Sequence, residues 1–467
     1  MDERKRQSGA AKDMTKGSSL RLILVFSIPL LIGNVFQQLY NMVDTIIVGR
    51  CIDTAALAAV GTTGPLNFLV IGFIMGITSG FGVLVAQRFG AKDEDGLRKA
   101  AGMAAVLCMI ITVLITALAV GTAMPLLRLI NTPDDIIRDS YRYIVVIYIG
   151  IAATMLYNML ACVLRALGDS RTPLYFLIIS SILNIGLDLL FILAFRMGVA
   201  GAAWATVISQ GVSGVLCFFY TKKKYPMLHL TKEDFKWNGK IAAKHLQIGL
   251  PMAFQFTITA IGVVIVQGAL NVFGTVKIAA YTAASKVAQL VTQPANTMGV
   301  TMANYAGQNL GADELDRIKD GVRKCTIVTL CFAVTAMGIL FLFGRPLCSL
   351  FITNDGNREQ VLSAAMEYLK ISSMFFPFLF VIFVYRNVLQ GIGKSFMPLM
   401  GGVFELAMRV GVAVTLPKRL GFFGVCLADP IAWAAAAIVL GISYFVIFGK
   451  ILREHRAQKE KRASLTS

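Results

Sequence analysis

Residues 54–87 read TAALAAVGTTGPLNFLVIGFIMGITSGFGVLVAQ, and no side chain in this stretch carries a charge. About 20 apolar residues suffice to cross the hydrocarbon core of a bilayer, so the run is long enough for one tilted transmembrane helix. Pro65 and the glycines would also permit a break into two shorter helices. We expect the single long helix.

Eleven further stretches of similar character lie on either side of it. Eight are uncharged, and three hold isolated charges, among them Asp188, Glu405 and Arg409. The expected spans are 22–43, 54–87, 104–127, 143–164, 172–195, 197–221, 246–276, 287–312, 325–344, 366–390, 395–417 and 430–449. With 56% hydrophobic and only 15% charged residues, the chain of 467 residues is excluded from the ordinary cytosolic enzymes. It is predicted to be an all-α integral membrane protein with twelve transmembrane helices.

The chain has a formal net charge of +18, and its Lys and Arg residues are distributed unequally between the two expected sides of the membrane. If the N-terminus is cytoplasmic, 31 of the 44 Lys and Arg fall in the expected cytoplasmic segments. This is the positive-inside pattern, and it predicts a multi-pass protein of the plasma or inner membrane with both termini in the cytoplasm. A basic surface against anionic lipid needs no nucleic acid to explain it, and we expect none as a partner.

Cysteine and histidine give no sign of a metal site. The eight cysteines are scattered along the spans without C-x-x-C pairs, which predicts buried free thiols. His229, His245 and His455 fall in expected cytoplasmic segments, where solvated side chains are expected. A Walker A motif is absent, since GIGKS at 391–395 is too short. We therefore expect no cofactor, and an ion gradient of H+ or Na+ as the energy source.

The two halves of the chain align with each other. At an offset of 221 residues Gly90-Ala91 meets Gly311-Ala312 and Pro125 meets Pro346, and at 225 Gly168 meets Gly393. Six helices per half is an even number, so the halves are expected to form two lobes related by a pseudo-two-fold axis along the membrane normal. The expected domains are a cytoplasmic tail (1–18), an N-lobe (19–221), a cytoplasmic connector (222–244), a C-lobe (245–450) and a C-terminal tail (451–467).

An ordered set of segments carries a family resemblance. The set comprises IPLLIGNVFQQLYNMVDTIIVGR, AALAAVG, AQRFGAKDEDGLRKA, LRALGDSRTPL and, in the second half, YRNVLQGIGKSFMPL. It resembles the multidrug and toxic compound extrusion (MATE) family over about residues 19 to 450. The resemblance implies a secondary active antiporter that exports drugs or toxic organic compounds, often cationic, in exchange for H+ or Na+ by alternating access.

Ionisable groups within the spans are the candidate functional residues, because a carboxylate at membrane depth costs about 2.5 to 3.5 kcal/mol. Asp44, Asp188 and Glu405 stand out. Tyr40 lies four residues before Asp44, and Asn184 four before Asp188, so each pair shares a helix face. Oxygen-rich groups of this kind suit a proton or a small hard cation. The alternative for Asp44 is that it caps or anchors the outer end of its helix.

The resemblance adds further members to this site. MATE proteins of the DinF-like branch have a cation site in the N-lobe, and the matching positions here are Tyr40, Asp44, Asn158, Asn184, Asp188 and Thr206. The NorM branch typically has an acid in the seventh helix, where the stretch LPMAFQFTITA offers only Gln255. The chain is therefore expected to be closer to the DinF-like branch.

Glu405 and Arg409 lie four residues apart with the glutamate first, the favourable order for a helical ion pair. We interpret the pair as structural, since a lone buried charge would cost more than the pair; a role in coupling is the alternative.

The sequence gives little information on the identity of the substrate. Aromatic, amide and methionine side chains on helices that could line a central cleft are the expected cavity residues, namely Phe36, Gln37, Met252, Phe254, Gln255, Phe256, Phe375, Phe376 and Tyr385. The expected partners are small-molecule substrates and the lipid bilayer, with the protein acting as a monomer. The alternative function is a flippase for a lipid-linked precursor. An enzyme is not expected, because no catalytic cluster is visible.

Overall fold

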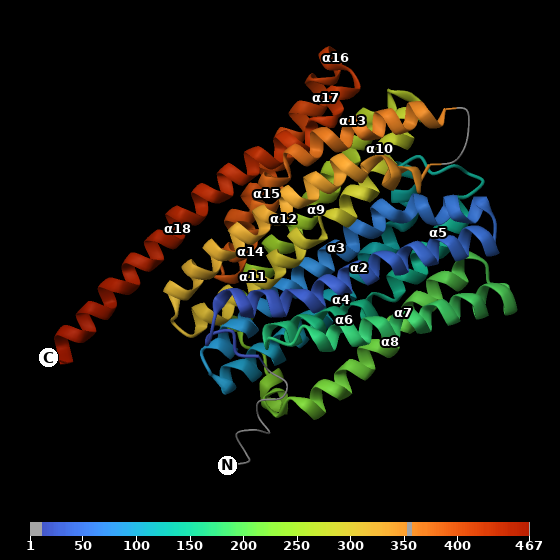
Figure 1. Ribbon diagram of the computed structural model, residues 1–467. Coiled ribbons are helices and arrows are strands. Elements are labelled where there is room, and N and C mark those ends of the chain that lie inside the picture. Colours follow the sequence, from blue (N-terminus) through green and yellow to red (C-terminus); the bar gives the residue numbers. More distant parts are fainter. Residues whose placement is uncertain (1–11, 353–356, 467) are drawn as a thin grey trace. The chain divides into compact units, whose positions relative to one another are not determined.

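The computed structural model describes residues 12–352 and 357–466, and within these ranges every regular element is a helix (Figure 1). Contacts divide the chain into two compact units. Of the described residues, unit 1 contains 12–14 and 24–260, and unit 2 contains 15–23, 261–352 and 357–466. The two units are described separately below.

The helices of unit 1 follow one another through short loops. They are α2 (Ser19–Cys51), α3 (Thr54–Gly90), α4 (Glu94–Leu129), α5 (Ile137–Ile149), α6 (Ile151–Ala166), α7 (Arg171–Leu189) with the π-helical turn η1 (Leu190–Ala194), and α8 (Val199–Lys224), followed by the short turns η2 (Pro226–Leu228) and η3 (Lys232–Phe235) and the first part of α9 (Gly239–Asn271). Helices α7 and α8 pack side by side along their lengths (Figure 1).

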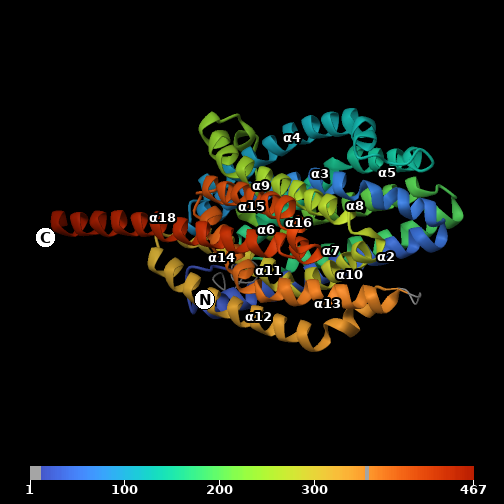
Figure 2. The same cartoon turned by 90° about the horizontal axis from the view of Figure 1, so that it is seen from above.

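Unit 2 begins within α9 and also consists of consecutive helices joined by short loops. It holds α10 (Gly274–Val291), α11 (Gln293–Gly311), α12 (Leu315–Ser349), α13 (Arg358–Met374), α14 (Phe376–Gly391), α15 (Phe396–Thr415), α16 (Pro417–Leu420), α17 (Phe422–Cys426) and α18 (Ala428–Thr466). Helices α12 and α13 run alongside each other (Figure 1 and Figure 2).

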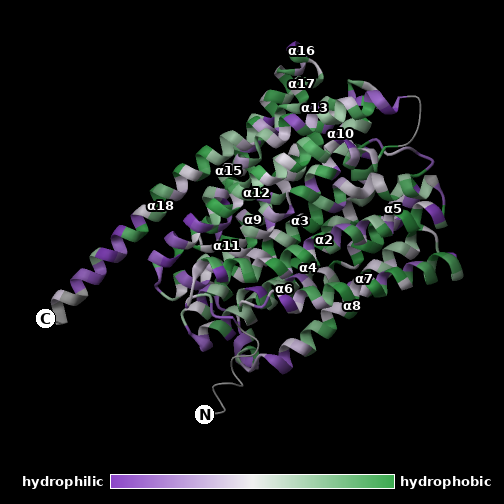
Figure 3. Ribbon diagram, viewed as in Figure 1, coloured by the Kyte–Doolittle hydropathy of each residue, from purple (hydrophilic) through white to green (hydrophobic). Residues whose placement is uncertain are grey.

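Among the described residues, nine helices are long and apolar enough to cross a membrane, and two bent pairs bring the number of spans to 11. Figure 3 shows apolar residues along these helices and hydrophilic residues gathered in the C-terminal part of α18. The expected long helix over 54–87 is confirmed, since α3 is continuous with Pro65 inside it. The expected span 287–312 is wrong in its limits, because the structure has two helices there, α10 and α11, with Pro294 in the first turn of α11.

The two bent pairs occupy matching places in the two halves. Helices α5 and α6 meet at Gly150 with a bend of 48°, and α13 and α14 meet at Phe375 with a bend of 50°. These positions are separated by the same 225 residues that align Gly168 with Gly393. The bend at Phe375 precedes Pro377, which cannot donate a backbone hydrogen bond to the previous turn.

Backbone conformations confirm the internal repeat. Lys92 and Asp313 both have positive φ, 57° and 63°, and they are separated by the offset of 221 residues. Gly168 and Gly393 have φ of 80° and 79°, a region that L-residues with side chains rarely adopt. The two halves therefore turn their chains in the same way at equivalent loops.

The expected domain limits stay a prediction. The division by contacts differs from them at two places: residues 15–23 belong with unit 2, and residues 245–260 of α9 belong with unit 1.

Within unit 1, α3 and α9 approach each other unusually closely. A Cβ atom on Gly76 would lie 2.6 Å from Cα of Ala253, and one on Gly80 would overlap the backbone of Gly249. In both helices the small residues are four apart, so they form a continuous face on which the backbones touch. His245, one turn before Gly249, is completely buried, with Nε2 3.0 Å from the Ala100 carbonyl oxygen. The expectation of a solvated His245 is therefore wrong.

The short loop between α6 and α7 is fixed by one carboxylate. Oδ1 of Asp169 accepts hydrogen bonds from the backbone N–H groups of Arg171 and Thr172 at 3.0 Å, and Oδ2 accepts one from the Tyr225 hydroxyl at 2.5 Å. Burial alone would raise the pKa of Asp169, but the hydrogen bonds from Thr172 and Tyr225 and the charge of Lys224 outweigh it and hold this pKa below its usual value. Asp169 thereby ties the start of α7 to the end of α8.

Candidate functional site

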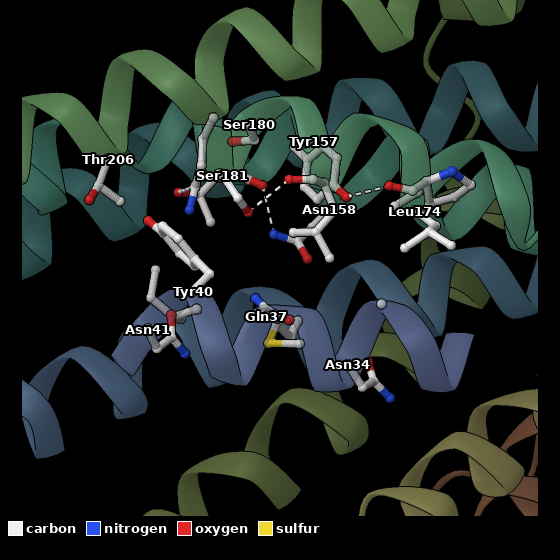
Figure 4. A pocket seen from close by; sticks show the side chains of 18 of the residues that line it. Asn34, Gln37, Tyr40, Asn41, Tyr157, Asn158, Leu174, Ser180, Ser181 and Thr206 are labelled. Atoms are coloured by element: carbon white, nitrogen blue, oxygen red, sulfur yellow. Dashed lines mark hydrogen bonds between the residues drawn. The ribbon is translucent and has the colours of Figure 1, made fainter. Parts of the chain in front are cut away.

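A polar pocket of about 420 Å³ lies within unit 1 between α2, α3, α5, α6, α7 and α8 (Figure 4). Amides and hydroxyls make up much of its lining, including Asn34, Gln37, Asn41, Asn67, Asn158, Gln210, Ser180, Ser181 and Thr206. Such a lining inside an apolar helix bundle is costly, because each polar group needs a partner. A pocket of this composition is therefore a candidate binding site.

Two carboxylates on different helices meet beside the pocket. Asp44 of α2 lines it, and Asp188 of α7 lies fully buried behind it, with the two side chains within hydrogen-bond reach of each other. Oδ1 of Asp44 is buried and has no hydrogen-bond partner among the described residues. Both acids predicted from the sequence are thus brought together. The alternative account, in which Asp44 only caps its helix, is not what the structure shows.

Hydroxyl and amide groups continue the polar cluster. Nδ2 of Asn184 donates to Oγ1 of Thr206 at 3.3 Å, and the Tyr40 hydroxyl lies within hydrogen-bond reach of the same threonine. Tyr40 projects from α2 across the pocket (Figure 4). Asn158 lines the pocket on α6, but its amide donates to the Thr154 carbonyl of its own helix at 2.8 Å. Five of the six expected residues therefore form one cluster, and Asn158 lies along the same pocket.

Sequence reasoning missed one member of this cluster. Tyr143 of α5 is 7% exposed, lines the pocket and is an electrostatic neighbour of Asp44, Asp188 and Tyr40. Ile147, four residues later, lines the same pocket, but a tyrosine and an isoleucine on one face of an apolar helix give no sequence signal of this role.

The chemistry that this cluster can perform follows from the two acids. Two carboxylates within hydrogen-bond reach repel each other if both are ionised, so they favour a shared proton or a bound cation between them. Hydroxyl and amide oxygens nearby are the ligands that hard cations prefer. The cluster can therefore take up and release one positive charge.

Most of the expected cavity residues do not line this pocket. Gln37 lines the pocket, whereas the other eight are absent from its lining. Met252 packs with Val83 and Ile248, because α3 and α9 are so close there, and Phe376 is completely buried in the core of unit 2. Neither side chain lines this pocket, and their assignment to a cavity surface stays a prediction.

The remaining six lie elsewhere, and their role as cavity residues is likewise still a prediction. Phe36 is half-buried on α2, Gln255 is buried on α9, and Phe256 of α9 lies against Gly72. Phe254 contacts Phe73, Phe375 contacts Phe378, and Tyr385 stacks on Tyr444.

In unit 2 the expected ion pair is present and larger than expected. Arg409 Nη2 lies 2.9 Å from Glu405 Oε1, and Arg409 Nε lies 2.7 Å from Asp429 Oδ1. Arg386 Nη2 binds the other oxygen of Glu405 at 2.7 Å. The Tyr281 hydroxyl donates to Asp429 at 3.2 Å. Two cations and two anions thus form a buried neutral network, of which sequence reasoning found half.

Comparisons with known proteins agree with the fold. A family model described as MatE matches residues 29–190 and 248–415. The probable multidrug resistance protein YpnP of Bacillus subtilis is 30% identical over 390 residues, which cover 82% of this chain and 85% of that protein. The probable multidrug resistance protein YoeA of the same organism is 28% identical over 446 residues, covering 93% and 96%. The solved structure of a MOP superfamily transporter from Pyrococcus furiosus superimposes with a TM-score of 0.88 at 24% identity, covering 95% of this chain and 99% of that chain.

Proposed function

Because the chain belongs to the MatE family of multi-pass membrane transporters, we propose that it is a secondary active antiporter that exports drugs or toxic organic compounds in exchange for H+ or Na+. The names of its relatives, both probable multidrug resistance proteins, support the substrate class. The pocket volume of about 420 Å³ falls within the range that drug-sized ligands occupy.

One observation carries the proposal for coupling: Asp44 and Asp188 lie within hydrogen-bond reach of each other at a pocket large enough for substrate. An ion that binds this pair changes the charge of the pocket, and substrate bound nearby then changes the affinity for the ion by the same factor. Each charge that crosses 100 mV supplies about 2.3 kcal/mol, enough for more than a tenfold gradient of a neutral substrate. Alternating exposure of the pocket to the two sides completes the exchange.

The experiment measures ethidium efflux from proteoliposomes under an imposed pH or sodium gradient. We expect Asp44→Asn and Asp188→Asn each to reduce gradient-driven transport to the level of empty liposomes, because an amide cannot take up the coupling charge. The matched control is Asp139→Asn, which makes the same change at a half-exposed acid of α5 outside the pocket lining. Undiminished uphill transport in either acid variant would remove that residue from the coupling site.

A flippase for a lipid-linked precursor gains no support from the pocket. Binding a lipid diphosphate would require a groove with several basic residues. Among the described lining residues Arg165 is the one cation.

A further inference from the structure

The charges of the pocket in unit 1 are placed at its two ends. Asp44 and Arg165 are the charged side chains among its described lining residues. The lining on α2 extends from Pro29 to Asp44, and at 1.5 Å per residue this is a distance of about 22 Å. Gly33 lies against Leu174 near one end, and Asp44 meets Asp188 at the other.

Arg165 belongs to the end opposite the acids. It lies in the last turn of α6 and is an electrostatic neighbour of Tyr157, whose hydroxyl donates to the Pro173 carbonyl at 3.0 Å. Leu174, next to Pro173, is the residue that contacts Gly33. In Figure 4, Leu174 and Asn34 lie at one end of the pocket, and Tyr40 and Thr206 lie at the other.

The guanidinium of Arg165 has N–H donors available for a further hydrogen bond. Its recorded hydrogen bond runs from Nη2 to the Cys162 sulfur at 3.0 Å, and a cysteine sulfur is a weak acceptor. No carboxylate lies within 4.0 Å of it in residues 12–352 and 357–466, whereas Arg409 contacts two. A half-buried guanidinium carries five N–H donors in a planar fork that matches a carboxylate. It is therefore suited to an anionic group that enters the pocket.

The side chains that line the pocket between its two ends indicate which chemical groups the ligand carries besides the anionic one. Phe68, Tyr143 and Tyr157 supply aromatic surfaces, and the amides Gln37 and Asn67 supply donors and acceptors. Oδ1 of Asn67 is buried without a hydrogen-bond partner among the described residues, so it can accept one from a ligand. The lining fits a flat aromatic molecule with polar substituents better than a purely aliphatic one.

We propose that Arg165 is a specificity-determining residue of this pocket that pairs with the carboxylate of aromatic substrates that carry one. This inference rests on the proposed function, which it deepens by naming a substrate group and the residue that recognises it. Because the acid pair lies at the other end, Arg165 selects the substrate without binding the coupling ion. Changing it should alter the preference between substrates with and without a carboxylate.

The test uses two probes that differ at one group: norfloxacin, an aromatic zwitterion with a carboxylate, and its methyl ester, which keeps the cationic ring but loses the anion. Binding to the full chain in nanodiscs is followed by quinolone fluorescence. We expect the wild-type protein to bind the acid about tenfold or more tightly than the ester, the effect of a hydrogen bond to a charged group. Arg165→Gln should abolish this preference by weakening the acid alone, and Arg165→Lys should retain part of it.

Arg171→Gln is the matched control, because Arg171 is exposed, lies six residues further along and is absent from the pocket lining. It should leave both affinities unchanged. Equal affinity of the wild-type protein for acid and ester would overturn the proposal even if Arg165→Gln does not fold. An unchanged preference in a folded Arg165→Gln protein would overturn it as well.

Ethidium separates this inference from the proposed function. Ethidium has no carboxylate, so the wild-type protein should export ethidium under the imposed ion gradient whether or not it prefers the norfloxacin carboxylate, and Arg171→Gln, outside the lining, should do the same. If wild-type liposomes transport ethidium but show no preference for the norfloxacin carboxylate, the inference fails and the proposed function stands. If the wild-type protein transports neither compound, the proposed function fails.

Discussion

At the scale of single residues, Arg409 stands between two carboxylates. Its guanidinium binds Glu405 at 2.9 Å and Asp429 at 2.7 Å, and its side chain is only 5% exposed. Removing one member of such a network leaves an uncompensated charge, whereas removing one cation and one anion together keeps the remainder neutral. Arg386 and Glu405, 2.7 Å apart, would form that remainder.

We therefore expect Arg409→Gln to destabilise the protein by about 3 to 5 kcal/mol, the cost of breaking a buried ion pair. The double variant Arg409→Gln with Asp429→Asn should be milder, because the Arg386–Glu405 pair stays intact. Thermal unfolding in detergent and ethidium transport would be measured for both. Normal stability of the double variant combined with lost transport would assign the network to coupling instead of to structure.

The residues that could be predicted from the sequence are those whose charge or polarity is conspicuous within an apolar span. Asp44 and Asp188 could be found in this way, and their meeting across α2 and α7 followed from the fold. Tyr143 could not, because a tyrosine in an apolar helix packs in many ways. Arg165 and Arg386 could not either, since both lie near the ends of expected spans and were counted as cytoplasmic charges; the structure buries Arg386 to 9% exposure.

At the scale of helices, the contact of α3 with α9 depends on small residues. Gly76→Ala would bring Cβ within 2.6 Å of the Ala253 backbone, which cannot move aside as a flexible side chain would. Gly61 lies in the same helix, and a Cβ there meets nothing within 4 Å. The two glycines thus allow the same substitution in crowded and in open surroundings.

We expect Gly76→Ala to lower stability by about 1 to 3 kcal/mol, because the extra methyl group overpacks the interface. Gly61→Ala should be neutral or stabilising by up to about 1 kcal/mol, since alanine loses less backbone freedom in a helix. The melting temperature of the purified variants in detergent measures both effects. Equal melting temperatures would mean that the helices can separate without cost.

Element limits were the least predictable part of the fold. The uncharged run located α3 because charged residues lie at its two ends, Asp53 at the N-cap and Arg88 in the last turn. The break between α10 and α11 was missed, because Thr292 and Pro294 lie inside an uncharged stretch and Pro65 stands inside an unbroken helix. Hydrophobicity measures where a helix can cross a membrane and is insensitive to where its axis bends.

At the scale of the whole molecule, the internal repeat gives two similar halves with different chemistry. The loops match in backbone conformation at Lys92 and Asp313, yet the position equivalent to Asp44 is near Val266, which is buried in an apolar core. Unit 1 has an acid pair beside a pocket, and unit 2 has a neutral ion network. This difference in charge pattern places the proposed coupling site in unit 1 alone.

The orientation of the chain is a prediction that only the distribution of charge supports. With 31 of 44 Lys and Arg in the segments assigned to the cytoplasm, the connector 222–244 should face the cytoplasm, because translocating so many cations is disfavoured. His229 of this connector is exposed, and so is Asp134 in the loop after α4, which the same assignment puts outside. On a cysteine-free background, an impermeant thiol reagent applied to intact cells should modify Asp134→Cys and spare His229→Cys. In permeabilised cells both positions should be labelled, which controls for access. The reverse pattern in intact cells would invert the topology and with it the direction of transport that the proposed exchange requires.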